Sequence, residues 1–404
     1  MLSPSMTDTG RVIAAGDRVA DFWMSLPGVK RILVVVPHVQ AGERLLDILP
    51  ALESDMRIQV MLSTPETGYR WAGIGEYVRR FDGLVIPWRQ AVSTRFDLVL
   101  AACDWGLAEL DGPVVLMPHG VGSLGSRIGY DGDVRRHGLH RDHLMRGDDV
   151  IPAALALATD DEKLVLAETC PEALPGAVVA GDPSFDRMLA GRPYRDAYRH
   201  ALGASTGQRI VVVSSTWSKH SLFGTDPTIF ARLVEELPQP DHLVVAVLHP
   251  FVWHAYSRRQ VLAWLSGPRE RGLVLLPPEE GWRAALAAAD LAVGDLGSVL
   301  QYAAGLGLPT LMSAGSLDGV RAGSPADLVS RIAAPLRLDR PLAPQVYRAK
   351  PPTDLKRAEV VRTITGRPGQ ALTILRETCY ALLGLDQPAH RVPVSPALLP
   401  EPIE

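Results

Sequence analysis

Residues able to bind phosphate gather in one turn, which follows the short apolar run at 291–293. Small residues at 294–298 leave backbone N–H groups bare at the start of a helix expected from about Val299, and such a helix start can bind an anion. Asp295 and Ser298 are short and polar, so they could cap this helix and contact a ligand. An ordinary strand-to-helix turn explains the same residues, and this segment alone leaves both readings open.

Histidines and hydroxyl residues follow several other apolar runs. In chain order they are His38, His119-Gly120, Ser214-Ser215-Thr216, His249-Pro250 and the loop that contains Glu279 and Glu280. A single histidine after a strand is usually structural. However, the carboxyl ends of parallel strands meet at one edge of a sheet, where ligands bind in open α/β folds. The repeated placement therefore favours a binding site assembled from both halves of the chain.

The apolar runs must be strands if these residues are to meet. Strands are expected at 31–36, 58–62, 83–86, 98–101, 114–117, 154–158 and 178–180, and again at 209–213, 243–248, 273–276, 291–293 and 310–312. Runs such as RILVVV are apolar on both faces, which is typical of parallel strands covered by helices. The sequence therefore predicts an α/β fold of two doubly wound, Rossmann-like domains that face each other across a cleft.

Three segments are expected. Residues 1–185 would form a first domain with an opening helix at 11–25, and residues 186–340 a second domain. Residues 341–404 would hold a Pro-rich stretch, a helix at 370–383 and a loose tail after Gln387. The segment 122–149 has many Gly, Arg, His and Asp residues and is expected to be a long functional loop.

Composition narrows the function. The 404 residues suit two domains, and a net charge of −4 with 21% charged residues gives no electrostatic footprint for nucleic acid. No apolar run is long enough to span a membrane. The start of the chain lacks a signal-peptide pattern, and three scattered cysteines suit a reducing compartment, so a cytoplasmic location is expected.

The order of these motifs resembles the GT-B superfamily, and most closely the CDP-glycerol:glycerophosphotransferase family. The resemblance spans about residues 30–315, and its order and spacing carry it, since each motif is weak alone. The matching pieces are Pro118-His119-Gly120, Val179-Ala180-Gly181-Asp182-Pro183, Ser214-Ser215-Thr216-Trp217, Leu248-His249-Pro250 and Asp295-Leu296-Gly297-Ser298.

The resemblance implies a transferase that moves a polyol-phosphate or glycosyl group from a nucleotide-diphospho donor to a hydroxyl acceptor, without a metal or cofactor. His119 would be the general base, with His38 as a competing candidate. The donor would be bound through Ser214, Ser215, Thr216, His249, Asp295, Gly297 and Ser298, and Glu280 would accept hydrogen bonds from its hydroxyls.

Two alternatives stay open. A UDP-sugar 2-epimerase-like isomerase would need acidic residues in the first half, for which Asp104, Glu109 and Asp131 are the candidates. A nucleotide-binding GT-B protein without turnover is the other. The sequence departs from the polymerases after the His-Gly motif, so glycerol-phosphate polymerisation is not expected. His137, His140 and His143 lack the spacing of a zinc pair and instead suggest an arginine-rich loop over an anionic substrate.

Overall fold

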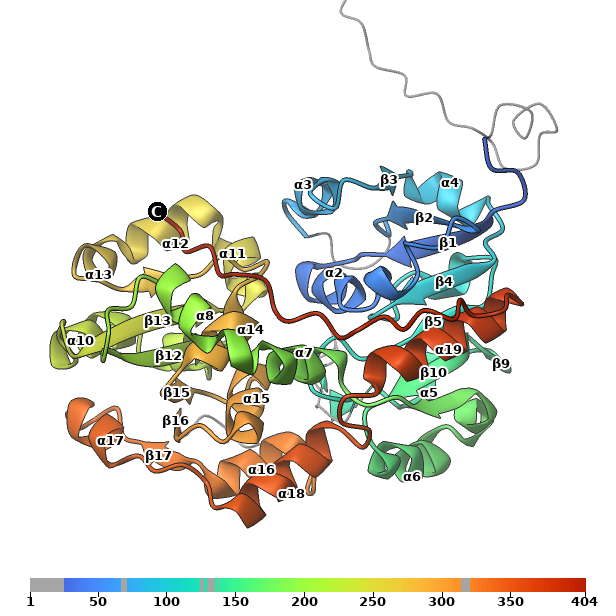
Figure 1. The fold of residues 1–404 in the computed structure, drawn as a ribbon. Coiled ribbons are helices and arrows are strands. Elements are labelled where there is room, and N and C mark those ends of the chain that lie inside the picture. Colours follow the sequence, from blue (N-terminus) through green and yellow to red (C-terminus); the bar gives the residue numbers. More distant parts are fainter. Residues whose placement is uncertain (1–24, 67–70, 124–126, 129–134, 137, 314–319) are drawn as a thin grey trace, which may run out of the picture.

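The computed structural model describes residues 25–66, 71–123, 127–128, 135–136, 138–313 and 320–404. Within these residues the chain forms two parallel β-sheets, each with helices on both faces, and helices from both units meet between them (Figure 1). This is the predicted α/β architecture of two doubly wound units. The expected helix at 11–25 (Ser25 apart), Asp131 and His137 lie outside the described residues.

The first sheet has seven parallel strands in the order β11-β10-β5-β4-β1-β2-β3. Its strands are β1 (Lys30–Val35), β2 (Ile58–Ser63), β3 (Leu84–Val85), β4 (Leu98–Ala101), β5 (Val114–Leu116), β10 (Pro152–Leu157) and β11 (Ala177–Val179). Its main helices are α2 (Val39–Leu46), α3 (Ile74–Arg79), α4 (Trp88–Val92) and α6 (Asp160–Thr169). Four successive residues of β1 are buried, because both faces of the sheet are covered.

The second sheet has six parallel strands in the order β14-β13-β12-β15-β16-β17. They are β12 (Arg209–Ser215), β13 (His242–Leu248), β14 (Val274–Leu275), β15 (Leu291–Gly294), β16 (Thr310–Ser313) and β17 (Ala334–Leu336). The helices include α7 (Pro183–Gly191), α8 (Arg195–Ala201), α10 (Ile229–Glu236), α11 (Pro250–Tyr256), α14 (Trp282–Ala288), α15 (Ser298–Leu306) and α16 (Pro325–Ile332). Strand β17 was not expected from the sequence.

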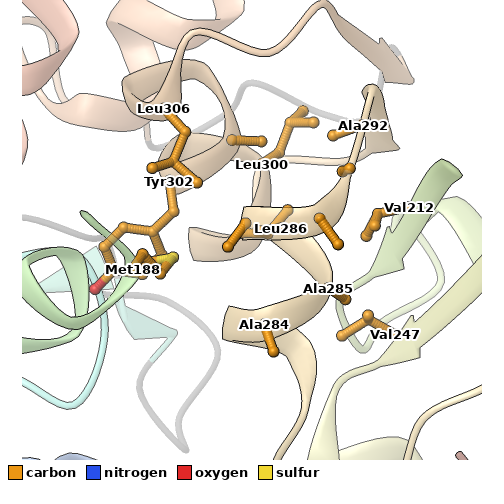
Figure 2. Close-up of a cluster of buried hydrophobic side chains, with 14 of the residues drawn as sticks. Met188, Val212, Val247, Ala284, Ala285, Leu286, Ala292, Leu300, Tyr302 and Leu306 are labelled. Carbon is orange, nitrogen blue, oxygen red and sulfur yellow. The ribbon is translucent and has the colours of Figure 1, made fainter. Parts of the chain in front are cut away.

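Alanines let α14 pack closely on the second sheet. Figure 2 shows Ala284 and Ala285 beside Val212 of β12 and Val247 of β13. Both alanines are fully buried, and the close packing places the start of α14 over the carboxyl edge of the sheet. The buried core therefore fixes where the residues before and at the start of α14 lie.

The expected long loop at 122–149 is only partly a loop. Its described residues include α5 (Arg141–Leu144) and two short antiparallel pairs, β6 (Arg127–Ile128) with β7 (Arg135–Arg136) and β8 (Met145–Arg146) with β9 (Asp149–Val150). Leu139 and Leu144 are fully buried under the first sheet. Two leucines among many polar residues were too sparse to predict this packing.

The C-terminal region crosses between the two units. Helices α17 (Ala343–Arg348) and α18 (Asp354–Ile364) follow the second sheet, and α18 packs on α15 and α16. Helix α19 (Ala371–Leu383) packs on the first sheet through Leu375 and Cys379. None of these helices, nor any other described one, is long and apolar enough to cross a membrane.

The prediction of a loose tail is wrong. From α19 the chain runs back along the second unit, as the red segment of Figure 1 shows. Arg187 donates hydrogen bonds to the carbonyls of Ser395 and Pro396 at 3.2 and 3.1 Å, and Ile403 N–H donates to Leu275 O at 2.9 Å. The Pro-rich tail has few N–H donors of its own, but its carbonyls accept from residues far away in the sequence, which composition could not reveal.

Candidate functional site

A cavity of about 490 Å³ lies between the two units, at the carboxyl ends of their strands. Strand β12 pairs with β13 on one side and β15 on the other, so the strand order reverses beside it. Loops after β12, β13, β14 and β15 line the cavity, together with α2 and the loop after β5 of the first unit. This is the place where open α/β sheets bind ligands.

His119 lies in the cavity wall, as the sequence predicted for a residue after β5. Its Nδ1 is 3.1 Å from the carbonyl oxygen of Ala102. A carbonyl only accepts, so Nδ1 carries the proton and the lone pair of the neutral ring lies on Nε2. This tautomer suits a group that accepts a proton from a ligand hydroxyl.

The residues after His119 touch the start of α15. A Cβ at Gly120 would lie 2.9 Å from Ser298 Oγ, so only glycine fits there without a shift. Val121 N–H donates to the same hydroxyl at 3.4 Å. The sequence motifs around His119 and Ser298, 179 positions apart, are thus direct neighbours across the two units.

His38, the competing candidate, has a different place. Its Nδ1 accepts from Ala41 N–H at 3.2 Å and so caps the start of α2. The ring packs against His119, with 4.9 Å between ring centroids, and against Trp71 and Trp105. His38 is buried and is not among the residues that line the cavity. The geometry therefore gives His119, and not His38, access to a ligand.

Asp295 braces the turn and does not face the cavity. Its Oδ2 accepts from Thr216 N–H at 2.9 Å, from the Thr216 hydroxyl at 3.0 Å and from Leu222 N–H at 2.9 Å. Oδ1 accepts from Gly297 N–H at 3.2 Å. The expected capping of α15 by Asp295 or Ser298 is wrong, because Gly297 is the N-cap and no side chain caps the helix. The first N–H groups of α15 are therefore left for other partners.

The predicted phosphate-binding residues otherwise come together. Ser214, Ser215, Thr216, Gly297 and Ser298 all line the cavity. The sequence analysis missed Arg321, Ser324 and the start of α16, which line it too. Among the described residues no ion pair involves Arg321. Ser324 caps α16 and precedes Pro325 at its first turn, a helix-start signal that the sequence does contain.

His249 lines the cavity as a neutral ring. Burial, reinforced by the nearby His119, lowers its pKa to about 3. Its Nδ1 accepts from Phe251 N–H at 3.1 Å, so Nε2 carries the proton and lies 2.8 Å from the side-chain amide of Gln40. Because Nε2 carries a proton, the Gln40 amide must present its oxygen, and not its nitrogen, to His249. Both ring nitrogens of His249 are thus used within the protein, and the neutral ring brings no charge to the cavity.

A buried ionic network joins the units behind the cavity, and the sequence analysis did not find it. Three arginines and four carboxyls take part, namely Arg44, Arg187, Arg283, Glu43, Asp47, Asp182 and Glu280. Arg283 reaches Asp47 at 3.2 Å, and Arg44 reaches Asp182 at 3.1 Å. Burial alone would raise the pKa of Asp47, but Arg283 and Arg187 outweigh it and lower that pKa.

Glu280 belongs to this network and is not among the residues lining the cavity. Its Oε1 accepts from Gly281 N–H at 3.1 Å and lies 3.5 Å from Arg283. Two of the three acidic candidates for an isomerase, Asp104 and Glu109, do not line the cavity either. Asp104 instead pairs with His143 at 2.8 Å.

In the segment 122–149, one of the expected histidines and two arginines among the described residues have local partners. His140 caps α5, Arg141 pairs with Glu172, and Arg146 donates to the carbonyl of Ala108. None of these three side chains lines the cavity. No group of three or more His, Cys, Asp or Glu side chains among the described residues is arranged to hold a metal ion.

Known structures share this fold. The wall teichoic acid polymerase TagF, in a His-to-Asn variant soaked with CDPG, aligns with a TM-score of 0.61 at 12% identity, over 89% of this chain and 90% of that one. A second TagF variant gives 0.54 at 12% identity, over 88% and 89%. Anabaena Alr3699/HepE in complex with UDP-glucose gives 0.47 at 14% identity, over 88% and 100%. No protein-family profile and no curated sequence matches the chain.

The likeness to TagF extends over both units and nearly the whole of each chain. The chain therefore has the two-domain GT-B fold that its motifs suggested. At 12% identity the match establishes the fold, and the chemistry must be argued from the site itself.

Proposed function

We propose that this protein is a metal-independent transferase that uses a nucleotide-diphospho donor, a CDP-alcohol or a nucleotide sugar, and a hydroxyl acceptor. One observation carries the proposal. His119, with its lone pair on Nε2, lies in the same inter-domain cavity as the uncapped start of α15 and the hydroxyls after β12. A proton acceptor and an anion-binding helix start are the two parts that transfer from such a donor needs.

The step follows from these positions. Nε2 of His119 takes the proton of the acceptor hydroxyl as its oxygen bonds to the transferred group. The bond between that group and the nucleotide breaks, and the electron pair leaves with the nucleotide phosphate. For a CDP-alcohol the oxygen attacks the distal phosphorus and CMP leaves, whereas for a nucleotide sugar it attacks the anomeric carbon and the nucleoside diphosphate leaves. The N–H groups of α15, the start of α16 and Arg321 would stabilise the departing charge.

A cytoplasmic location is part of this proposal. Cys103, Cys170 and Cys379 are buried and form no disulfide with one another, which suits a reducing compartment. The isomerase alternative loses support, because Asp104 and Glu109 lie outside the cavity walls. A nucleotide-binding protein without turnover would have the same geometry, so only an experiment can distinguish it from a transferase.

Thermal unfolding with CDP, CMP, UDP, GDP and TDP tests the nucleotide site. A ligand at 100 times its Kd stabilises the native state by about 2.7 kcal/mol, a shift of several degrees. If none of the five raises Tm, the proposal fails.

His119→Ala tests the chemistry. It should lower kcat by about 10²- to 10⁴-fold and leave the nucleotide-induced Tm shift in place. Equal turnover by both forms would reject His119 as the base. Nucleotide binding without turnover in either form, over a broad panel of donors and acceptors, would favour the binding protein, and epimerisation of UDP-N-acetylglucosamine would favour the isomerase.

A further inference from the structure

One carboxyl oxygen in the cavity wall has no partner among the described residues. It is Oε1 of Glu43, on the face of α2 that also carries Gln40 and Arg44. The side chain is 6% exposed and lines the cavity. A buried polar atom without a hydrogen bond is costly, and in native proteins such an atom usually meets a ligand or water.

The other oxygen of Glu43 is fully used. Oε2 accepts from Trp282 Nε1 at 3.0 Å and lies 3.4 Å from Arg283 NH1. Both of these partners are donors, so Oε2 acts as the acceptor of the carboxyl group. If the carboxyl holds a proton, that proton is on Oε1, the oxygen without a partner among the described residues.

We propose, building on the function proposed above, that Glu43 is a ligand-binding residue whose Oε1 hydrogen-bonds an uncharged oxygen, a hydroxyl or carbonyl, of the donor's nucleoside or transferred group. The charges around it support a neutral side chain. The network holds three arginines and, besides Glu43, three carboxylates, so it balances when Glu43 is uncharged. Burial acts in the same direction and raises the pKa of Glu43 well above its usual value, with Arg283 only partly opposing it.

Phosphate is not the group that Oε1 meets. Glu280 and Asp47 both lie near Glu43, and Arg283 is already shared among these three carboxyls. A phosphate placed there would meet carboxylates without a spare cation, whereas α15, α16 and Arg321 offer bare N–H groups and a guanidinium elsewhere in the cavity. The nucleoside or the transferred group is therefore the part of the donor that reaches α2.

The test compares Glu43→Gln and Glu43→Met with the matched control Glu280→Gln. Glu280 contacts the same arginine but does not line the cavity. The affinity of each protein for CDP, UDP, GDP and TDP, and for CDP-glycerol and UDP-glucose, is measured by calorimetry from pH 5.5 to 8.5. Circular dichroism confirms that each variant is folded.

Gln keeps an N–H donor at Oε1, so E43Q should bind within about threefold of wild type at low pH, whereas E43M should lose about five- to tenfold. Ionisation of Glu43 would place a negative charge near the ligand. Tyr77, Asp47, Glu280 and Arg283 face the same carboxyl, but they are shared by wild type and E43Q. The ratio of wild-type to E43Q affinity should therefore fall as pH rises through the pKa of Glu43. At low pH E280Q should bind like wild type, but its affinity should begin to fall at a lower pH, because Glu280 is one of the groups that raise the pKa of Glu43.

The outcomes are distinct. If wild type binds none of these nucleotides, the proposed function fails and the role of Glu43 with it. If wild type binds, and E43Q and E43M match it in affinity and pH profile, only the role of Glu43 is wrong. A loss confined to CDP-glycerol or UDP-glucose places Oε1 at the transferred group, and a loss on all compounds places it at the nucleoside. If E43Q does not fold, the affinity of E43M is compared with the affinities of wild type and E280Q instead.

Discussion

The two walls of the cavity are built differently. The second unit contributes loops and helix starts, whose hydroxyls and backbone N–H groups are held by hydrogen bonds within that unit, such as those of Asp295 to Thr216 and Gly297. The first unit contributes α2, whose charged face is neutralised by α7 and α14, more than a hundred residues away in the sequence. One wall is held together within its own unit and is mostly uncharged, and the other depends on charged partners from the opposite unit.

This difference indicates which wall of the cavity is more sensitive to substitution. An uncharged side chain in the wall of the second unit, such as Ser324, loses only its own hydrogen bonds when it is cut back, and its neighbours can relax. A buried charge that loses its partner cannot be compensated in this way, because the carboxylates around it remain out of contact with water. The α2 wall should therefore tolerate far less change than the wall made by the starts of α15 and α16.

Arg283→Met should give the largest effect. It removes the cation shared by Asp47, Glu43 and Glu280 and should destabilise the protein by about 3–5 kcal/mol. Urea unfolding followed by circular dichroism measures this. The control Arg331→Met cuts an exposed pair with Asp327 and should change stability by less than about 0.5 kcal/mol. Equal effects of the two substitutions would contradict the contrast between the walls.

His249→Gln probes the point where the two walls touch. The pKa of His249 is about 3 in the fold, below the usual 6.5 of an unfolded histidine, so the unfolded state takes up a proton first as pH falls. Wild type should lose up to about 2 kcal/mol between pH 6.5 and pH 5 through this group alone. The variant should show a shallower fall in denaturant titrations at the two pH values, and parallel curves would exclude a buried neutral His249.

Ser324→Ala should give the smallest effect. The Ser324 hydroxyl accepts from Asp327 N–H at 3.3 Å at the start of α16, and losing a cap costs about 1 kcal/mol. Ser324→Asn keeps a capping side chain and should restore most of the stability in the same urea titration. A loss as large as that of Arg283→Met would show that this wall is as sensitive to substitution as the α2 wall.

The same contrast explains what the sequence could predict. Apolar runs such as 31–36 and 209–213 identify buried strands by themselves, and the residues after such strands must meet at one edge. His119, His249 and Ser214 were found in this way. Glu43 and Arg283 could not be found, because an acidic or basic residue on a helix normally indicates a solvated face. Only the fold shows that they are buried together.

Other misses have equally specific causes. Asp295 carries the expected residue type at the expected turn, yet it braces Thr216 instead of facing the cavity. Sequence spacing cannot tell on which side of a turn a carboxylate lies. The tail after Gln387 has a composition typical of loose segments, and its order comes from Arg187, some 200 residues earlier.

The C-terminal region has a mechanical consequence for the protein. The chain passes between the two units three times, before α7, between α18 and α19, and along the tail to Ile403. All three connecting segments must bend together when one unit rotates relative to the other. The cavity can therefore open only by rotation about an axis that runs close to all three segments. The range of that rotation sets the size of the largest molecule that can enter the cavity.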